Sequence, residues 1–402
     1  MIGRNVRKIR TERGMSLRTL AALSGLTAGH LSRVERGLAN LDRRRSLLDV
    51  ADALRVAPNE LTGQPYDPQT RQEQAVRVAV TDLRDVLYGW SADGELDEEL
   101  DEERPGRDLS TLRAATERVD VLHADCALDT LGPLLPDLLT DLYGHAATGD
   151  AAARRDALTL LPVALHAASD LAHWAGEAET AYRASEQSVT AAEQVDNPAL
   201  LGFARFGMVH ALGHVPGRFA RRRAGQLAAR GADELQPHST DGPGAEMYGM
   251  LHLIAAWSDL TNGTGADVDA RIAEAQATAT RTGNGRAYRL WFGPANVRAW
   301  QAALAVERGE AERVRGLAAG VDLDALSVPE RKAGHLINVG RGLAQDAATA
   351  AEAVTAFRRA RRLTPMRVRL NPHVREVTDR LMYEVGGPDV RGFASWLGVI
   401  PR

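Results

Sequence analysis

Residues 16–37 read SLRTLAALSGLTAGHLSRVERG, and this stretch decides the fold of the first part of the chain. Two short helical runs lie on either side of Gly25, which can adopt the left-handed conformation that ends a helix and turns the chain. Ser16 and Thr27 stand where helix N-caps belong, because their hydroxyls can accept hydrogen bonds from free backbone N–H groups. Ala21 is small where the two helices must cross closely. The stretch therefore predicts two helices joined by a tight turn.

Further helices are predicted on both sides of this pair. Residues 2–13 form an apolar-periodic run that Gly14 ends, and a similar run lies near residues 45–55. Pro58 favours the start of a fifth helix. We therefore expect an all-α chain whose first domain is a five-helix unit over residues 1–64.

The charge of the chain is divided unevenly. Of its 49 basic and 53 acidic residues, 12 and 6 lie in residues 1–62, which leaves 37 and 47 for the remainder. A basic head on an acidic body is typical of a phosphate-binding module joined to a regulatory domain. In a helix-turn-helix the second helix lies in the DNA major groove and reads base edges. Double-stranded DNA is therefore the predicted partner.

Ten residues are the candidates for DNA contact. Arg33 is the candidate for a bidentate contact with guanine, and the other arginines are candidates for phosphate contacts, which position the protein without specifying sequence. A solvated loop is the alternative for the run 43–45. The ten candidates are Arg18, Thr27, Ala28, Gly29, His30, Ser32, Arg33, Arg36, Arg43 and Arg44.

The first 61 or so residues resemble the helix-turn-helix domain of the XRE (phage-repressor/Cro-like) transcriptional regulators. The resemblance implies that Arg10 of the first helix pairs with Glu35 of the third. Related repressors often carry polar amides where Ala28 and Gly29 stand, so this chain departs from the pattern there. The residues that carry the resemblance are Arg7, Arg10, Leu20-Ala21, Gly25, residues 31–37, Val50-Ala51, Leu54 and Leu61.

Residues 65–108 are predicted to be a linker helix followed by an acidic loop. The helix, over residues 66–90, carries Val76, Val80, Leu83, Leu87 and Trp90 at alternating steps of four and three. This spacing favours either a helix packed on its own C-terminal domain or a dimer seam. The loop, over residues 93–103, has eight acids in eleven residues, a composition typical of a solvated segment rather than a metal site.

Residues 109–402 read as helices broken by glycine and proline, without strand-like alternation. Helix pairs repeat at roughly 35–45 residues, which indicates an α-solenoid. The run from Ala353 through Phe357 and Ala360 to Pro365 resembles the second helix of a tetratricopeptide (TPR) repeat. Residues 291–297 (WFGPANV) resemble a signature in the C-terminal domains of actinobacterial XRE–TPR regulators. The resemblance implies a TPR-like body that senses a small molecule or peptide and dimerises.

Six of the aromatic residues of the body, at positions 248, 257, 288, 291, 292 and 300, fall in one part of the predicted solenoid. Together with nearby asparagines and arginines they could line a ligand pocket, since such pockets combine an apolar wall with a few polar groups. The alternative is that the aromatic side chains fill the core between helices. The candidates are Tyr248, Trp257, Arg289, Trp291, Asn296, Trp300, Asn338 and Arg341.

The sequence does not indicate catalysis, a cofactor or a metal site. It contains no P-loop, dinucleotide fingerprint or nucleophile elbow. His210 and His214 are four residues apart, but no third metal ligand is evident, so we expect a stacked pair of side chains. His166 and His173 lie two helical turns apart, and we interpret them in the same way. No membrane-spanning run or signal peptide is present, so we expect a cytoplasmic protein.

Two functional hypotheses follow. The first is a transcriptional regulator that binds a pseudo-palindromic operator as a homodimer and responds to an effector through its TPR-like body. The second is an interaction scaffold whose head binds DNA weakly or without specificity. The basic head and Arg33 favour the first hypothesis, and Ala28-Gly29 keeps the second open.

Overall fold

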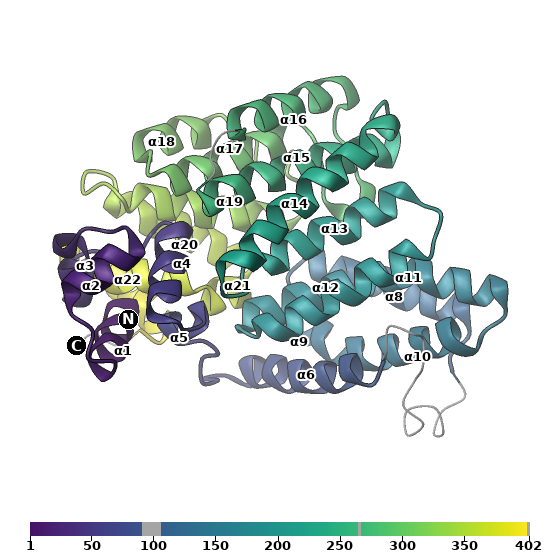
Figure 1. The fold of residues 1–402 in the computed structure, drawn as a ribbon, viewed down its shortest axis with the longest axis horizontal. Helices are drawn as coiled ribbons and strands as arrows, with labels where there is room; N and C mark the ends of the chain where they lie inside the picture. The colour runs from purple at the N-terminus through teal and green to yellow at the C-terminus, as the bar shows by residue number, and fades with distance from the viewer. Residues whose placement is uncertain (91–105, 264–266, 400–402) are drawn as a thin grey trace.

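The structure, a computed structural model, describes residues 1–90, 106–263 and 267–399. The protein is all-α, as predicted: the regular elements within these ranges are all helices. A helix-turn-helix head is followed by a helical, repeat-like body (Figure 1). The acidic run at 93–103, expected to be a solvated loop, lies outside the described residues.

The head has the local structure that the sequence predicts. Gly25 ends α2 with φ 68°. The Ser16 hydroxyl accepts from the Thr19 N–H at 3.0 Å, and the Thr27 hydroxyl accepts from the His30 N–H at 3.1 Å. The head helices are α1 (Ile2–Glu12), α2 (Leu17–Ser24), α3 (Ala28–Glu35), α4 (Arg44–Leu54) and α5 (Pro58–Thr62).

One ion pair fastens α1 to α3 inside the head. Arg10 Nε donates to Glu35 Oε1 at 2.6 Å, and its Nη2 donates to Oε2 at 2.8 Å. The hydrogen bond to Glu35 raises the pKa of Arg10. Both side chains are largely withdrawn from water, with 14% and 7% of their surface exposed. The pairing that the family resemblance implied is confirmed, and its bidentate geometry fixes how α3 is presented.

The body consists of helices that pack mainly against their neighbours in the chain, as in helical repeats. Glycine and proline separate them at the predicted breaks, for example at Gly176, which ends α11 with φ 92°. The helices are α6 (Arg71–Tyr88), α8 (Leu109–Ala124), α9 (Leu128–Leu131), α10 (Leu135–Thr148), α11 (Ala151–Ala175), α12 (Ala178–Glu193), α13 (Pro198–Leu212), α14 (Arg218–Leu235), α15 (Gly242–Asn262), α16 (Val268–Thr282), α17 (Pro294–Arg308), α18 (Ala311–Ala319), α19 (Pro329–Leu343), α20 (Ala350–Leu363), α21 (Pro365–Leu370), α22 (Pro372–Glu384) and α23 (Gly387–Leu397).

The array of helices curls back on itself. Helix α19 contacts α8, and α21 contacts α11, although these pairs are far apart in the sequence. The C-terminal helices thereby return to the N-terminal end, where α22 lies beside the head (Figure 1). Curvature of this kind gives a helical array a concave inner wall.

The apolar seam of α6 is buried within the chain. Val76, Val80, Leu83 and Leu87 are each at most 4% exposed and belong to a core shared with α10 and α11. Trp90 stacks on Tyr143 with 4.7 Å between ring centroids. Of the two interpretations of this seam, packing on the body is therefore the correct one. A dimer seam here is wrong, because the side chains that would form it are already covered.

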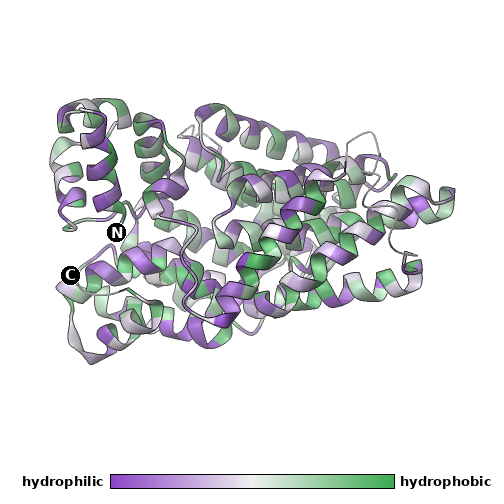
Figure 2. Ribbon diagram, turned by 90° about the horizontal axis from the view of Figure 1, so that it is seen from below, coloured by the Kyte–Doolittle hydropathy of each residue, from purple (hydrophilic) through white to green (hydrophobic). Residues whose placement is uncertain are grey.

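Hydrophobic and hydrophilic residues are mixed along most helices rather than segregated into separate ones (Figure 2). This pattern is typical of amphipathic helices that bury one stripe. Within the described ranges, no helix is both long enough and apolar enough to cross a membrane.

Candidate nucleic-acid interface and ligand cavity

The outer face of α3 is open to solvent. Thr27, Gly29, Arg33 and Arg36 are exposed, and Ala28, His30 and Ser32 are half-buried. Arg18 on α2 is exposed as well. Figure 1 shows α2 and α3 at the edge of the molecule that lies away from the body. The N-terminal residues of this helix are thus accessible to a ligand as large as DNA.

The opposite side of the head is docked on the body. The Ile2 N–H donates to Glu376 Oε2 on α22 at 2.9 Å. Arg221 of α14 forms an ion pair with Asp52 of α4, with 2.8 Å between Nη2 and Oδ2. These contacts come from two separate parts of the body, so they fix the orientation of the head as well as its position.

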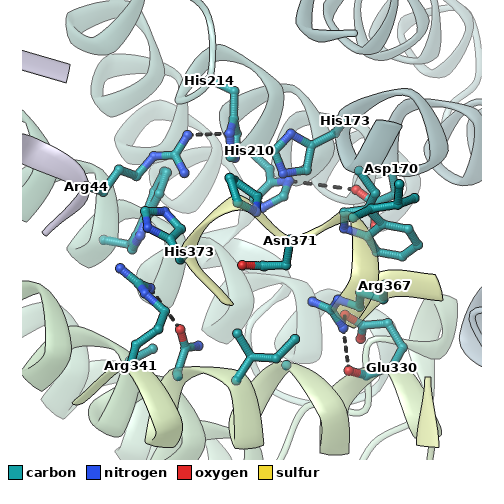
Figure 3. Close-up of a pocket in the computed structure, with 18 of the residues that line it drawn as sticks. Arg44, Asp170, His173, His210, His214, Glu330, Arg341, Arg367, Asn371 and His373 are labelled. Atoms are coloured by element: carbon teal, nitrogen blue, oxygen red, sulfur yellow. Dashed lines mark hydrogen bonds and ion pairs between the residues drawn. The ribbon is translucent and has the colours of Figure 1, made fainter. Parts of the chain in front are cut away.

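A cavity of about 310 Å³ lies between the head and the concave wall of the body. Helices α4 and α5 close one side, and the inner helices α11, α13, α17 and α19 form most of the rest. Figure 3 shows the polar side chains that point into it. Six of the chain's eleven histidines line the cavity: His166, His173, His210, His214, His335 and His373.

Glu307 of α17 links the two walls of this cavity. Its Oε2 accepts from the backbone N–H of Arg44 at 2.6 Å, and its Oε1 accepts from Arg341 Nη2 at 2.8 Å. Arg341 also donates to the carbonyl oxygen of Asp42 at 2.7 Å. Among the described residues no side chain of the head caps the start of α4, so this carboxylate of the body takes the N-cap role and its charge complements the helix dipole.

The three consecutive arginines of the head have different surroundings. Arg43 and Arg45 are exposed, and Arg45 pairs with Asp49 at 3.4 Å. Arg44 instead points into the cavity, where its Nη2 donates to the carbonyl oxygen of Gly213 at 3.0 Å and to His214 Nδ1. Burial lowers the pKa of Arg44 to about 10. In this arrangement Arg44 is directed away from the surface that carries the other DNA-contact candidates, so we do not propose it as a phosphate contact.

Five of the eight predicted ligand residues line the cavity: Trp257, Asn296, Trp300, Asn338 and Arg341. Asn296 Nδ2 donates to the carbonyl oxygens of Leu290 and Trp291 at 2.8 and 3.0 Å, so this amide also holds the turn before α17. Arg341 Nη1 donates to Asn338 Oδ1 at 3.1 Å.

The other three predicted ligand residues lie outside the cavity. The Tyr248 hydroxyl donates to Glu274 Oε1 at 3.1 Å, and its ring belongs to the core. Arg289 pairs with Asp120 at 2.5 Å and with Glu117. Trp291 occupies the turn before α17 with φ 51°. For Tyr248 the alternative interpretation, a core side chain, describes its position.

The cavity histidines are neutral at pH 7. Burial lowers the pKa of His166 and of His335 to about 4. Burial, together with nearby positive charge, also lowers the pKa of His173, His214 and His373 well below its usual range. Because a guanidinium can only donate, the Arg44 contact requires that His214 Nδ1 accept and that its proton reside on Nε2.

For one histidine beside the cavity, His123, the pKa is shifted in the opposite direction. His123 Nε2 lies 3.0 Å from Asp170 Oδ2. Burial alone would lower the pKa of His123, but the hydrogen bond and the charge of Asp170 raise it. Burial alone would likewise raise the pKa of Asp170, and His123 and its neighbours hold it well below its usual range. Both shifts favour the charged forms, an imidazolium beside a carboxylate.

Several cavity residues were not predicted from the sequence, notably Glu307, Glu330, Arg367 and His373. Arg367 Nη1 donates to Glu330 Oε1 at 2.6 Å, which brings α21 against α19. The one available signal was the histidine spacing, since His210 and His214 and, two helices earlier, His166 and His173 are placed to share a helix face. The sequence could not show that both pairs face the same space.

The comparisons with known proteins agree with the structure of the head. Residues 2–62 match a family model described as a helix-turn-helix domain. Comparison with curated proteins and with solved structures gave no match. The matched residues span α1 to α5 and include the exposed α3. Residues 2–62 are therefore a helix-turn-helix domain, a DNA-binding unit, and it is joined to an all-helical, repeat-like body.

Proposed function

We propose that this protein is a sequence-specific transcriptional regulator whose helical body senses a small molecule or the end of a peptide. The observation that carries the proposal is the cavity, because the DNA-binding head forms part of its wall. A ligand that enters it contacts α4 and the body at once.

The exposed face of α3 supports sequence-specific binding. The side chain of Arg33 is exposed and can reach base edges, and Arg18, Arg36 and Arg43 are exposed as well. The head resembles XRE-type domains and the body resembles TPR-like repeats of the actinobacterial regulators. One such helix reads only a few base pairs, so we propose a homodimer on a pseudo-palindrome with half-sites about 10 base pairs, or a multiple of that, apart.

The chemistry of the cavity favours a ligand that carries a carboxylate or another group rich in acceptors. Its volume of about 310 Å³ is at the lower end of the range for small-molecule sites. Trp257 and Trp300 supply apolar surface. Among the described residues, no acceptor satisfies the buried Nε atoms of Arg44 and Arg341. These donors can be satisfied by an acidic or carbonyl-bearing ligand.

A ligand acts on DNA binding only if it binds one arrangement of the head better than another. Displacement of Arg341 would remove its hydrogen bond to Glu307, the carboxylate that accepts from the backbone N–H of Arg44, and displacement of the Arg44 side chain would remove its contacts with Gly213 and His214. The head could then change its position relative to the body, and with it the spacing of two recognition helices in a dimer.

The test begins with selection of DNA from a random pool by the full-length protein, followed by light scattering of the complex. We expect a shared palindromic sequence and a dimer. Enrichment of no sequence would instead favour the scaffold hypothesis, and a monomer on and off the selected DNA would contradict the dimer.

A thermal-shift screen of acidic metabolites and short peptides then identifies ligands, and each is tested for its effect on operator affinity. Trp300→Ala should abolish the shift, whereas the matched control Trp291→Ala, which lies outside the cavity, should retain it. A ligand whose effect is lost equally in both variants, or persists in both, would contradict the cavity as its site.

A further inference from the structure

Three histidines meet on one wall of the cavity. His210 and His214 come from the end of α13 and the residues that follow it, and His173 comes from the neighbouring α11. One potential ligand atom of each lies within 4.8 Å of the others. The ring centroids of His173 and His214 are 3.6 Å apart. The ring centroid of His210 lies 5.3 Å from that of His173 and 5.1 Å from that of His214 (Figure 3). The third ligand that the sequence did not reveal is thus supplied by tertiary structure.

We define the histidine cluster as His173, His210 and His214, and each of these imidazoles can offer one ring nitrogen to a metal ion. All three are neutral, and metal ions bind the neutral form. His214 becomes a ligand either through Nδ1, when its hydrogen bond with Arg44 breaks, or through Nε2, whose proton has no acceptor among the described residues and must first leave. Asp170 Oδ1 lies 3.7 Å from His210 Nδ1, which leaves Nε2 of that ring as the free nitrogen. At 3.7 Å this contact is an ion-pair distance rather than a hydrogen bond, so Asp170 would favour a bound cation through its negative charge.

A second group of potential ligands nearby is already occupied. His123, His166 and Asp170 also lie within 4.8 Å of one another. However, His123 Nε2 and Asp170 Oδ2 are hydrogen-bonded to each other at 3.0 Å, so a metal ion would have to break this bond to use either atom. This difference favours the histidine cluster over the second group.

We propose that His173, His210 and His214 bind one divalent transition-metal ion of the zinc class, with the fourth coordination position open to the cavity. Three imidazoles form a borderline-soft donor set that suits Zn²⁺, Co²⁺ and Ni²⁺ rather than Mg²⁺ or Ca²⁺. A three-ligand site leaves a position for water or for an acidic group of a small molecule. The ion binds whether or not the protein binds DNA, so this inference does not rest on the proposed function.

Arg44 couples this site to the head. Its guanidinium donates to His214 Nδ1 and lies over the ring of Trp257, with Cζ 5.1 Å from the centroid. A divalent cation on the cluster repels this positive charge. The ion and Arg44 therefore compete for His214, and metal binding should loosen the start of α4.

The experiment uses tag-free, full-length protein stripped with a chelator and titrated with Co²⁺, then with Zn²⁺ in competition. We expect one Co²⁺ per chain with the intense visible absorption of a tetrahedral site, bleached by Zn²⁺. His214→Ala should weaken binding by at least about 100-fold, and Asp170→Asn should weaken it less, because Asp170 acts on the site through its charge at 3.7 Å. The matched control is His335→Gln, which changes another cavity histidine and should leave the affinity unchanged.

Arg44→Met provides a test that misfolding cannot imitate. Removal of the competing charge should raise metal affinity by about tenfold or more, corresponding to about 1.4 kcal/mol. Absence of the cobalt absorption, or equal affinity in the wild-type protein and His214→Ala, would overturn the proposal. An unchanged or reduced affinity in Arg44→Met, with circular dichroism confirming its fold, would overturn the competition with Arg44.

Discussion

The head presents two faces built from the same kinds of residue, and their surroundings make them chemically different. On the outer face, Arg33 of α3 extends into solvent. On the inner face, Arg44 of α4 lies among neutral histidines, with a lowered pKa and its backbone N–H bound to Glu307. An arginine in water keeps its charge available for DNA, whereas an arginine in a cavity must share donors with the wall that buries it. Charge in a sequence thus predicts a basic head but does not predict which of its arginines faces outward.

The largest expected difference between the two faces is in how far their stability falls when the pH is lowered. Buried histidines with a lowered pKa bind fewer protons in the folded than in the unfolded protein. Their contribution to stability is therefore intact above the unfolded pKa of about 6.5 and is lost as the pH falls toward about 4. His166 and His335, with pKa values of about 4, mark the lower limit of this window.

Hydrogen exchange at pH 7.5 and at pH 5 measures this response. We expect exchange to increase at pH 5 in α4, α11 and α13, beyond the intrinsic effect of pH, and to increase less in α2. His335→Gln, which removes one titrating group, should make the melting temperature less dependent on pH. A pH dependence that is the same in the variant and in the wild type would contradict this assignment.

The next largest effect concerns the ion pair that supports the outer face. Arg10→Ala leaves the Glu35 carboxylate buried without its partner, which costs about 3–5 kcal/mol when burial is deep. We expect the amides of α1 and α3 to exchange much faster in the full-length protein, while the order of preference among DNA sequences stays the same. A loss below about 1 kcal/mol would show that the pair behaves like an exposed one.

Arg33→Ala tests the outer face itself. If Arg33 contacts a guanine, the variant should lose about 1–3 kcal/mol of discrimination at one position of the operator and little affinity for random DNA. Competition binding at fixed salt measures both quantities. An even loss across specific and random DNA would reassign Arg33 to a phosphate contact.

The smallest expected effect is a difference between Arg43 and Arg44 in the salt dependence of DNA binding. Arg43→Ala should weaken binding to all DNA sequences alike. It should also reduce the slope of log affinity against log salt concentration by about 1 in magnitude, as expected for the loss of one phosphate contact. Arg44→Ala should leave that slope unchanged, because its side chain points into the cavity. A reduced slope in both variants would show that Arg44 leaves the cavity when DNA binds.

The sequence by itself determined the features that depend on neighbours in the chain. Ser16, Thr27 and Gly25 could be identified because a cap or a left-handed turn is formed by residues within one helical turn. The breaks between body helices follow from proline and glycine for the same reason. The Arg10–Glu35 pair joins residues farther apart, and it was found through the resemblance of the whole domain to a family rather than from spacing.

Only the tertiary structure decided which residues share the cavity. His173 and His214 are brought together by the packing of α11 on α13, and Arg44 joins them because the array curls until its inner wall meets the head. The same curvature buries the α6 seam, which in the sequence is equally compatible with a partner chain. A periodic pattern specifies that a helix face is apolar or polar but not what will cover it. That depends on the cumulative angle between successive helix pairs, which is set by side-chain packing over the whole array.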